Sequence, residues 1–422
     1  MPPLTETPPP RTDAAGGPGS RRRVRRLSLA RWSTLHRWLG IGLGLWFALV
    51  GLTGTLLVWR DEVDGLLNPA WFQAPASSGP TLPVDDLIER VRAAQPSLGR
   101  IERLRFPDTP GQALRLQVRG ALARVEAARL ELFVDPATGT VLGQRGLDRL
   151  SLTRADAMRT LYEFHRNVLL GEPGSNIVGV AGCLLLTSAV SGLVLAWPRS
   201  RERWKGLLRI AWRSNATRVA FDVHRSSGAL LAVLVLLATI TGTTLVWPNY
   251  VRDAVASLSR VEPIPVLPFS VAQGDEEPLP LQALLERVLA AFPGHRVAEL
   301  RLSERGLTGV LFQLRDDGLD VHRLGDTIVW LHPLTGAPLA ERSTRTRSAG
   351  EQFMHWLLPL HVGSAFGGPG RVAMAVVGIA PFVLVGTGLW VWWKKRPGER
   401  VARERQAIRR RGSASAGRPP GP

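Results

Sequence analysis

The sequence predicts a membrane α-helical protein, with four transmembrane helices in two parallel repeats and two small α+β domains outside the membrane. Four apolar segments have about the 20 residues that a helix needs to cross a bilayer. Histidine, glycine and tryptophan residues follow these segments in an order that occurs twice. Each of the two longer connecting segments contains an amphipathic helix pattern, and alternating strand patterns follow it.

The four apolar segments are interpreted as transmembrane helices. The first is too long for the core of a signal peptide and has no small-residue cleavage site after it, so we expect it to be retained. The segments are residues 35–59, 176–197, 228–247 and 372–393.

Basic residues gather in three segments, 1–35, 198–223 and 394–422, which together hold the whole net charge of +18. Because Lys and Arg near transmembrane helices are retained in the cytoplasm, we expect both termini there and the two longer connecting segments outside the cytoplasm. This predicts a multi-pass membrane protein. The basic charge then reflects topology and attraction to membrane lipid, and we expect no nucleic-acid partner.

The single cysteine, Cys183, lies in the middle of the second apolar segment. It can form no disulfide within the chain, and the sequence has no C-x-x-C-H motif for covalent haem attachment. Any haem must therefore be bound non-covalently.

The histidines carry the clearest sign of the duplication. His36 matches His224 at an offset of 188 residues, and His165 matches His361 at an offset of 196. Because each copy contains two helices, both copies enter the membrane in the same orientation, and matching residues lie at equal depth. We expect the first pair near the cytoplasmic surface and the second pair near the periplasmic surface.

The longer connecting segments repeat at an offset of 197 residues. Residues 84–94 and 281–291 are charged on one side and apolar on the other, so we predict an amphipathic helix in each. Alternating strands follow, and residues 135–139 and 332–336 supply turn residues. The apolar strand positions of the first copy are Leu114, Leu116, Val118, Leu130, Leu132 and Val134.

These patterns divide the chain into nine segments. They are a disordered basic N-terminus (1–30), the first transmembrane helix (31–62), the first α+β domain (63–152), a periplasmic-side helix with the second transmembrane helix (153–198), a basic cytoplasmic loop (199–223), the third transmembrane helix (224–248), the second α+β domain (249–346), a periplasmic-side helix with the fourth transmembrane helix (347–396) and a disordered basic C-terminal tail (397–422).

Two histidine pairs beside apolar helices indicate two bis-imidazole haem sites. Two imidazole ligands leave haem iron six-coordinate, which favours electron transfer over binding of a substrate at the metal. We therefore predict two haem b groups, one held by His36 and His224 and the other by His165 and His361. Interfacial or structural roles are the alternative for these histidines. Zinc or copper is less favoured, because neither pair offers a third or fourth ligand.

Residues beside the first pair are further candidates. Gly40 and Gly228 lie one helical turn after the histidines, where the missing side chain could admit a flat macrocycle or serve helix packing. Arg37 and Arg225 could bind haem propionates, or could act only as positive charges on the cytoplasmic side.

The second pair has one alternative ligand. His355 lies six residues before His361, and its counterpart in the first copy is Arg159. We prefer His361, because its own counterpart is the histidine at position 165.

The order of these motifs resembles the PepSY-associated transmembrane family of bacterial inner-membrane proteins, over about residues 31–397. The motifs are His-Arg-Trp-Leu-Gly (36–40), Thr-Gly-Thr-Leu-Leu-Val-Trp (53–59), Asp-Pro-x-Thr-Gly (135–139), a histidine with Gly-x-Pro-Gly (171–174), and an apolar helix ending in Gly-Leu-x-x-x-Trp, with the order repeated in the second half. The family includes iron-regulated membrane proteins and ferrisiderophore reductases. The resemblance implies PepSY-like α+β domains and two b-type haems that carry electrons outward.

The function that this resemblance implies is reduction of a ferric siderophore or chelate in the periplasm, which would make the protein an oxidoreductase of the ferric-chelate reductase type. The sequence has no nicotinamide or flavin fingerprint, so we expect a cytoplasmic donor or the quinone pool to supply the electrons. Two alternatives stay open. One is a non-catalytic membrane anchor that binds or regulates a peptidase, and the other is an accessory iron-uptake subunit.

Overall fold

The computed structural model describes residues 18–75, 79–120, 129–262, 277–302, 309–316 and 324–416, and within these ranges it describes side chains from residue 29 to residue 396. The chain divides into two compact units. One unit comprises Met1–Leu45, Thr187–Ala232 and Leu384–Pro422, and the other comprises Trp46–Leu186 and Val233–Val383.

Four helices of the described chain are long and apolar enough to cross a membrane, and each of them covers one of the four predicted apolar segments to within two residues. Large apolar side chains on these helices, such as Leu45 and Leu230, are exposed on the protein surface, as expected where lipid covers a helix. The helices are α1 (Pro18–Leu57), α6 (Gly171–Ala196), α8 (Ala216–Val246) and α13 (Gly367–Ala416).

Two of these helices extend further than the sequence predicts. α1 begins at Pro18 and α13 continues to Ala416, although disorder is predicted for residues 1–30 and 397–422. Both extensions are rich in Arg, which has high helix propensity. Residues 1–17 and 417–422 lie outside the described part of the chain.

One antiparallel sheet of eight strands contains all the named strands of the described chain, in the order β4-β3-β2-β1-β5-β6-β7-β8. The predicted strand residues of the first copy lie in β2 and β3. The strands are β1 (Arg100–Arg105), β2 (Leu114–Arg119), β3 (Arg129–Val134), β4 (Val141–Gly146), β5 (His295–Leu302), β6 (Val310–Asp316), β7 (Thr327–Leu331) and β8 (Pro338–Arg342).

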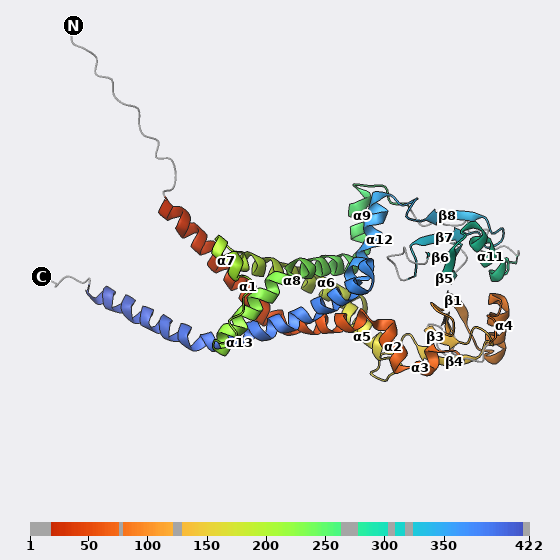
Figure 1. The fold of residues 1–422 in the computed structure, drawn as a ribbon, viewed down its shortest axis with the longest axis horizontal. Helices are drawn as coiled ribbons and strands as arrows, with labels where there is room; N and C mark the ends of the chain where they lie inside the picture. Colours follow the sequence, from red (N-terminus) through yellow and green to blue (C-terminus); the bar gives the residue numbers. More distant parts are fainter. Residues whose placement is uncertain are drawn as a thin grey trace, which may run out of the picture. The chain divides into compact units, whose positions relative to one another are not determined.

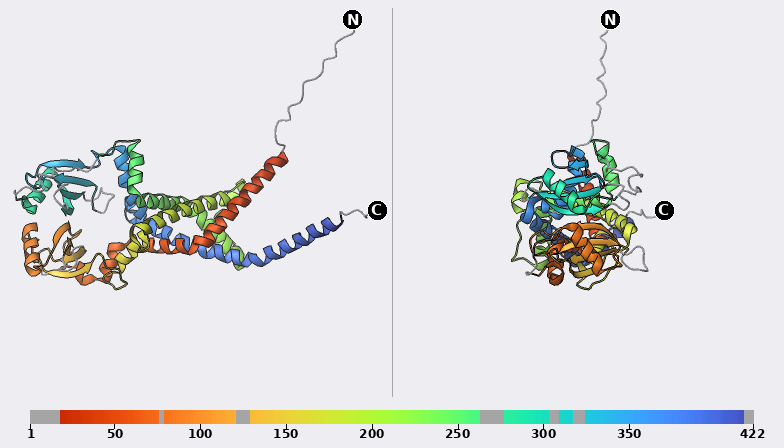
Figure 2. Two further views of the ribbon diagram at one scale, coloured as in Figure 1. Left: turned by 180° about the vertical axis from the view of Figure 1, so that it is seen from behind. Right: turned by 90° about the vertical axis from the view of Figure 1, so that its right-hand side faces the viewer.

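One face of the sheet is apolar and is covered by two helices, α4 (Val84–Ala94) and α11 (Leu281–Ala291), which have the predicted bounds. The two helices contact each other, and both Figure 1 and Figure 2 show α11 above α4. Leu87 of α4 and Leu284 of α11 belong to the same buried cluster as residues of β1 and β5. Each fully buried leucine contributes about 1.5–3 kcal/mol, so this shared core is a main source of stability.

The sequence predicts two separate α+β domains, whereas the structure joins their strands into one sheet. β1 pairs with β5, with Leu104 opposite Leu300. The helices are also linked, because Asp85 of α4 accepts hydrogen bonds from the backbone N–H groups of Leu281 and Gln282, and the Gln282 side chain accepts one from Val84. Each helix thus caps the start of the other.

The opposite face of the sheet mixes charged side chains with apolar ones such as Phe133, and a buried ion cluster fixes α2 (Arg60–Leu67) against it. Arg145 of β4 lies 2.7 Å from Glu131 of β3 and 2.8 Å from Asp64 of α2. Burial alone would raise the pKa of Glu131, but the charges of Arg145 and Arg115 and a hydrogen bond from Arg145 hold that pKa below its usual value.

Shorter helices precede and follow the long ones. α2 packs against α5, and α9 packs against α12. The shorter helices are α3 (Pro69–Phe72), α5 (Ala157–Asn167), α7 (Arg201–Gly206), α9 (Pro248–Ala256), α12 (Ala349–Val362) and the 3-10 helix η1 (Ser364–Phe366).

Two of these helices end differently although they occupy matching places in the chain. α12 begins with a capping box between Ser348 and Glu351 and ends at Gly363, which has φ +81°. α5 ends at Val168, which has φ +53°, in the left-handed region that β-branched residues rarely adopt. Backbone strain therefore accumulates three residues after His165.

Candidate functional site: two histidine pairs

The structure brings together the residues of the first predicted pair. His36 lies on α1 and His224 lies on α8, and their ring centres are 6.0 Å apart with an interplanar angle of 77°. Both side chains are half-buried. All residues of this pair and of its contacts described below lie in one compact unit.

The residues of the second predicted pair also meet. His165 lies near the end of α5 and His361 near the end of α12, with ring centres 6.4 Å apart and an interplanar angle of 47°. Neither helix is one of the four candidate membrane spans, so this pair is carried by the short helices that precede α6 and α13.

Every histidine of the two pairs is fixed through its Nδ1 atom to a backbone carbonyl group of another helix. Because a carbonyl oxygen can only accept, Nδ1 carries the proton and Nε2 keeps a free lone pair. This is the arrangement in which a histidine binds a metal through Nε2. The Nδ1–oxygen distances are 3.0 Å for His36 to Ser188, 2.9 Å for His224 to Leu384, 3.0 Å for His165 to Val50 and 3.0 Å for His361 to Ala238.

A hydroxyl group three residues after each carbonyl group completes the contact. The hydroxyl donates a hydrogen bond to that same carbonyl group, which lies one turn earlier in its own helix. The hydroxyl oxygen also lies within hydrogen-bonding distance of the histidine Nδ1 atom. The Nδ1–oxygen distances are 3.1 Å for Ser191 with His36, 3.2 Å for Thr387 with His224, 3.0 Å for Thr53 with His165 and 3.3 Å for Thr241 with His361.

A glycine follows each hydroxyl residue, and the histidine ring lies against it. A Cβ atom at these positions would come within 2.7–3.2 Å of the Cε1 atom of the ring, closer than such atoms ordinarily approach. We call each set of carbonyl, hydroxyl and glycine a histidine cradle. The four cradles are Ser188, Ser191 and Gly192 for His36; Leu384, Thr387 and Gly388 for His224; Val50, Thr53 and Gly54 for His165; and Ala238, Thr241 and Gly242 for His361.

The sequence analysis missed the cradles, although the sequence contains their signal. A Ser-Gly or Thr-Gly pair occurs once in each of the four apolar segments, at positions 191–192, 387–388, 53–54 and 241–242. Thr53-Gly54 and Thr241-Gly242 served only to align the copies. Their role depends on contacts between helices, which the sequence does not state.

The two pairs can hold a metal ion only if it brings other ligands. Among the described residues, no group of three or more His, Cys, Asp or Glu side chains is placed to bind one metal ion. An imidazole nitrogen lies about 2 Å from a bound first-row metal ion, so two rings on opposite sides of one ion would have centres about 6 Å apart. The two imidazoles of each pair are therefore far enough apart that they could hold one ion between them.

Burial keeps the second pair neutral. Removal from water, together with the charge of the neighbouring His361, lowers the pKa of His165 to about 4, against the opposing hydrogen bond to Val50. Burial also lowers the pKa of His361. Both rings are therefore unprotonated at neutral pH, as a metal ligand must be.

The other predicted residues near the first pair lie in different surroundings. A Cβ atom at Gly40 would meet nothing within 4 Å, so helix packing does not explain this glycine, while one at Gly228 would be in ordinary contact with Leu384. Arg37 lies over the ring of Trp38. The haem contacts assigned to these residues stay predictions.

The Arg225 side chain contacts the loop that precedes α8. It donates hydrogen bonds to the carbonyl groups of Gly206, Leu207 and Arg209 and lies 3.2 Å from Asp222. This side chain therefore holds the loop in place, and its predicted contact with a haem propionate stays untested.

The alternative ligand His355 lies apart from His165. Its Nε2 atom is 3.0 Å from a carboxylate oxygen of Asp326. The ring that faces His165 is that of His361, as the duplication predicts.

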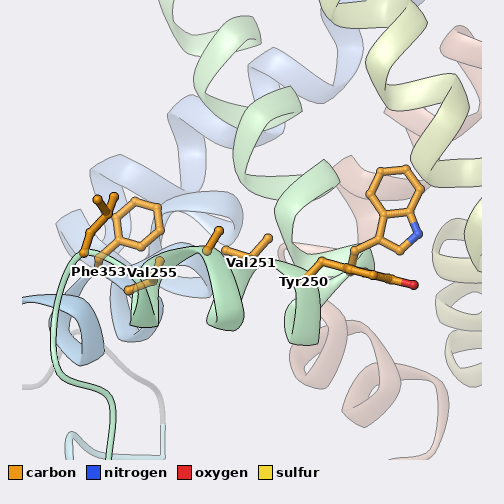
Figure 3. A pocket seen from close by; sticks show the side chains of 7 residues that line it. Tyr250, Val251, Val255 and Phe353 are labelled. Carbon is orange, nitrogen blue, oxygen red and sulfur yellow. The ribbon is translucent and has the colours of Figure 1, made fainter.

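An apolar groove lies between α9 and α12 in the unit that contains the second pair. Its labelled side chains, Tyr250, Val251, Val255 and Phe353, are shown in Figure 3, and Trp247, Ala254 and Leu258 complete the lining. Because the lining contains no histidine, cysteine or carboxylate, the groove offers nothing to a metal ion.

Comparison with known proteins gives one family match. The family model described as the PepSY-associated TM region matches residues 33–395. A search of curated proteins found no significant match.

Proposed function

Because this chain belongs to the PepSY-associated TM region family, we propose that it is a bacterial inner-membrane electron-transfer protein. It binds two non-covalent haem b groups and reduces a ferric siderophore or chelate in the periplasm. The basic segments 1–35, 198–223 and 394–422 support cytoplasmic termini, and the segments that form the sheet are then periplasmic. Electrons enter from a cytoplasmic donor or from the quinone pool.

The observation that carries this proposal is the repeated geometry of the histidine pairs. Four imidazole rings, each held by a cradle that leaves Nε2 unprotonated, meet in two pairs at 6.0 and 6.4 Å. Interfacial histidines that bind only water have no reason to share one set of contacts four times. A histidine that binds a metal usually donates its other ring N–H to a fixed acceptor, as each of these rings does.

The residues of the chain determine what such a group can do. A bound haem supplies one-electron redox chemistry, and its potential depends on axial ligands, hydrogen bonds and burial. The cradles fix the orientation and tautomer of the four rings, so little reorganisation is needed when charge changes. Two imidazoles per iron leave no open coordination position, which favours transfer to an external acceptor over binding of the acceptor at the metal.

The test is the absorption spectrum of the purified protein in detergent. We expect a reduced b-type spectrum with about two haems per chain, loss of one haem in His36→Ala and loss of the other in His165→Ala. His355→Ala is the matched control, because this histidine binds Asp326, and it should keep both haems. Reduction of ferric chelates by the reduced protein then tests the acceptor.

The result that would contradict the proposal is a colourless protein from haem-replete cells. That outcome would favour the alternative of a membrane anchor that binds or regulates a peptidase, or of an accessory iron-uptake subunit.

A further inference from the structure

Two arginines face each other at the place where the halves of the sheet pair. Arg103 of β1 is directly opposite Arg301 of β5. Their next neighbours in the same row are Gln117 of β2 and Leu311 of β6, which carry no charge. Like charges directly opposite each other destabilise a sheet, so this position departs from what folding alone favours.

One buried carboxylate forms an ion pair with both arginines. The side chain of Glu299 is 2% exposed, its Oε1 atom lies 3.5 Å from Nε of Arg103, and the same atom bonds Nε of Arg301. Glu102 and Glu131 also act on Arg103, but both are shared with further arginines, so this face of the sheet keeps a positive excess. The side chains of Arg103 and Arg301 are 36% and 40% exposed, so their guanidinium groups are accessible from outside.

The surroundings of the pair are rich in arginine and contain further shared carboxylates. Asp61 lies between two arginines and Glu102 between three. These arginines are Arg105 and Arg115 for Asp61, and Arg100, Arg119 and Arg129 for Glu102. Arginine presents a planar fork of donors that matches a carboxylate, which lysine does not.

We infer that the Arg103–Arg301 pair binds an anionic metal chelate through carboxylate groups on the outside of the chelate. A bidentate guanidinium–carboxylate contact supplies the attraction, and the bound anion offsets the repulsion between the two arginines. The inference rests on the proposed function in one respect: the chelate is taken to carry the ferric ion that the protein reduces.

The position of the pair suits that role. Asp61 ties the same face of the sheet to α2, and α2 packs against α5, the helix that carries His165. The arginine face and the His165–His361 pair thus belong to one compact unit.

The test uses gallium(III) citrate, which has the charge and shape of a ferric chelate but cannot be reduced. Its binding to the full-length protein in detergent is measured by calorimetry at low and high salt. We expect binding that weakens with salt, and at least about a 10-fold loss of affinity in Arg103→Gln/Arg301→Gln, because contacts to charged groups are lost. Arg92→Gln, which removes one positive charge at an exposed position of α4, should bind as the unchanged protein does.

A second variant covers the case in which the double variant does not fold. Gln117→Glu places a carboxylate opposite Arg103, which offsets the positive excess without removing an arginine, and it should also weaken binding. Unchanged affinity in a folded double variant and in Gln117→Glu would overturn the inference. Absence of binding to the unchanged protein, or equal binding of inorganic phosphate, would do the same.

The two proposals fail in distinguishable ways. Gallium cannot accept an electron under these conditions, so the measurement does not depend on haem. His165→Ala, which removes a proposed haem ligand, should still bind gallium(III) citrate.

Discussion

A Cβ atom placed on Gly242 would lie 2.7 Å from Cε1 of His361, so the ring occupies the space that any larger residue would need. The Thr241 hydroxyl and the Ala238 carbonyl group hold the Nδ1 atom of the same ring from the same helix. The position of His361 is therefore set by α8, although the residue belongs to α12.

Replacing the cradle glycines should displace the histidines in a graded way. We expect the largest loss of haem in Gly242→Ala and the smallest in Gly388→Ala, because the Cβ atoms would lie 2.7 and 3.2 Å from the respective Cε1 atoms. Haem content per chain is the measurement. Gly386→Ala, two residues from Gly388 and with nothing within 4 Å of its Cβ position, should keep both haems. Equal haem loss in Gly386→Ala would show that the cradles are not the cause.

Removing a cradle hydroxyl should weaken a site without abolishing it. Thr53→Val keeps the shape of the side chain and the Val50 carbonyl contact of His165 but removes the hydroxyl at 3.0 Å. Loss of such a partner typically costs 10- to 100-fold in metal affinity or activity. Haem affinity and the midpoint potential of that haem are the readouts. Thr244→Val removes a hydroxyl that bonds only along its own helix to Thr241, and it should change neither.

Acid should destabilise the sheet through Glu131. Its pKa is held below the usual value in the folded protein, so the unfolded chain binds more protons, and stability falls as pH decreases below the ordinary glutamate pKa of about 4.3. Glu131→Gln leaves Arg145 without one of its buried partners and should cost about 3–5 kcal/mol. It should also flatten the dependence of thermal unfolding on pH between about 5 and 3.

The control for Glu131 is Glu89→Gln on the exposed side of α4. This change should leave both the unfolding temperature and its pH dependence as they are. A pH profile that is the same in Glu131→Gln as in the unchanged protein would rule out this carboxylate as the source.

The strained end of α5 offers a stabilising change. Asparagine tolerates the left-handed conformation of Val168 better than a β-branched residue does, so Val168→Asn should raise the free energy of unfolding by about 1 kcal/mol. The unfolding temperature measures this. Alanine lacks the polar group with which asparagine forms hydrogen bonds to the nearby backbone. Val168→Ala should therefore raise the free energy of unfolding by less. A lower unfolding temperature in Val168→Asn than in the unchanged protein would mean that the packing of Val168 matters more than its backbone conformation.

The sequence was sufficient for features that depend on local pattern or on the duplication. Both amphipathic helices have the predicted bounds, because charge, apolar period and proline mark their ends. His165 faces His361 as predicted, because matching residues of a parallel repeat lie at equal depth.

Features that depend on pairing across the whole chain could not be predicted in this way. Leu104 pairs with Leu300. The sequence pattern of their strands is equally consistent with edge strands of two separate sheets. The facing of Arg103 and Arg301 could not be predicted either, because it depends on the same pairing. The overall charge of the connecting segments is balanced and gives no hint of it. Arg225 shows the converse case, because its basic charge suggested a ligand contact while the loop carbonyl groups already occupy it.

The pairing of Leu104 with Leu300 also has an evolutionary consequence. A single ancestral copy with two helices could have built this sheet only by association of two identical subunits, with each histidine pair formed across the dimer axis. In such a homodimer, the residues before the two leucines would have been identical. In one chain the two positions need not be identical, and they hold Arg103 and Glu299.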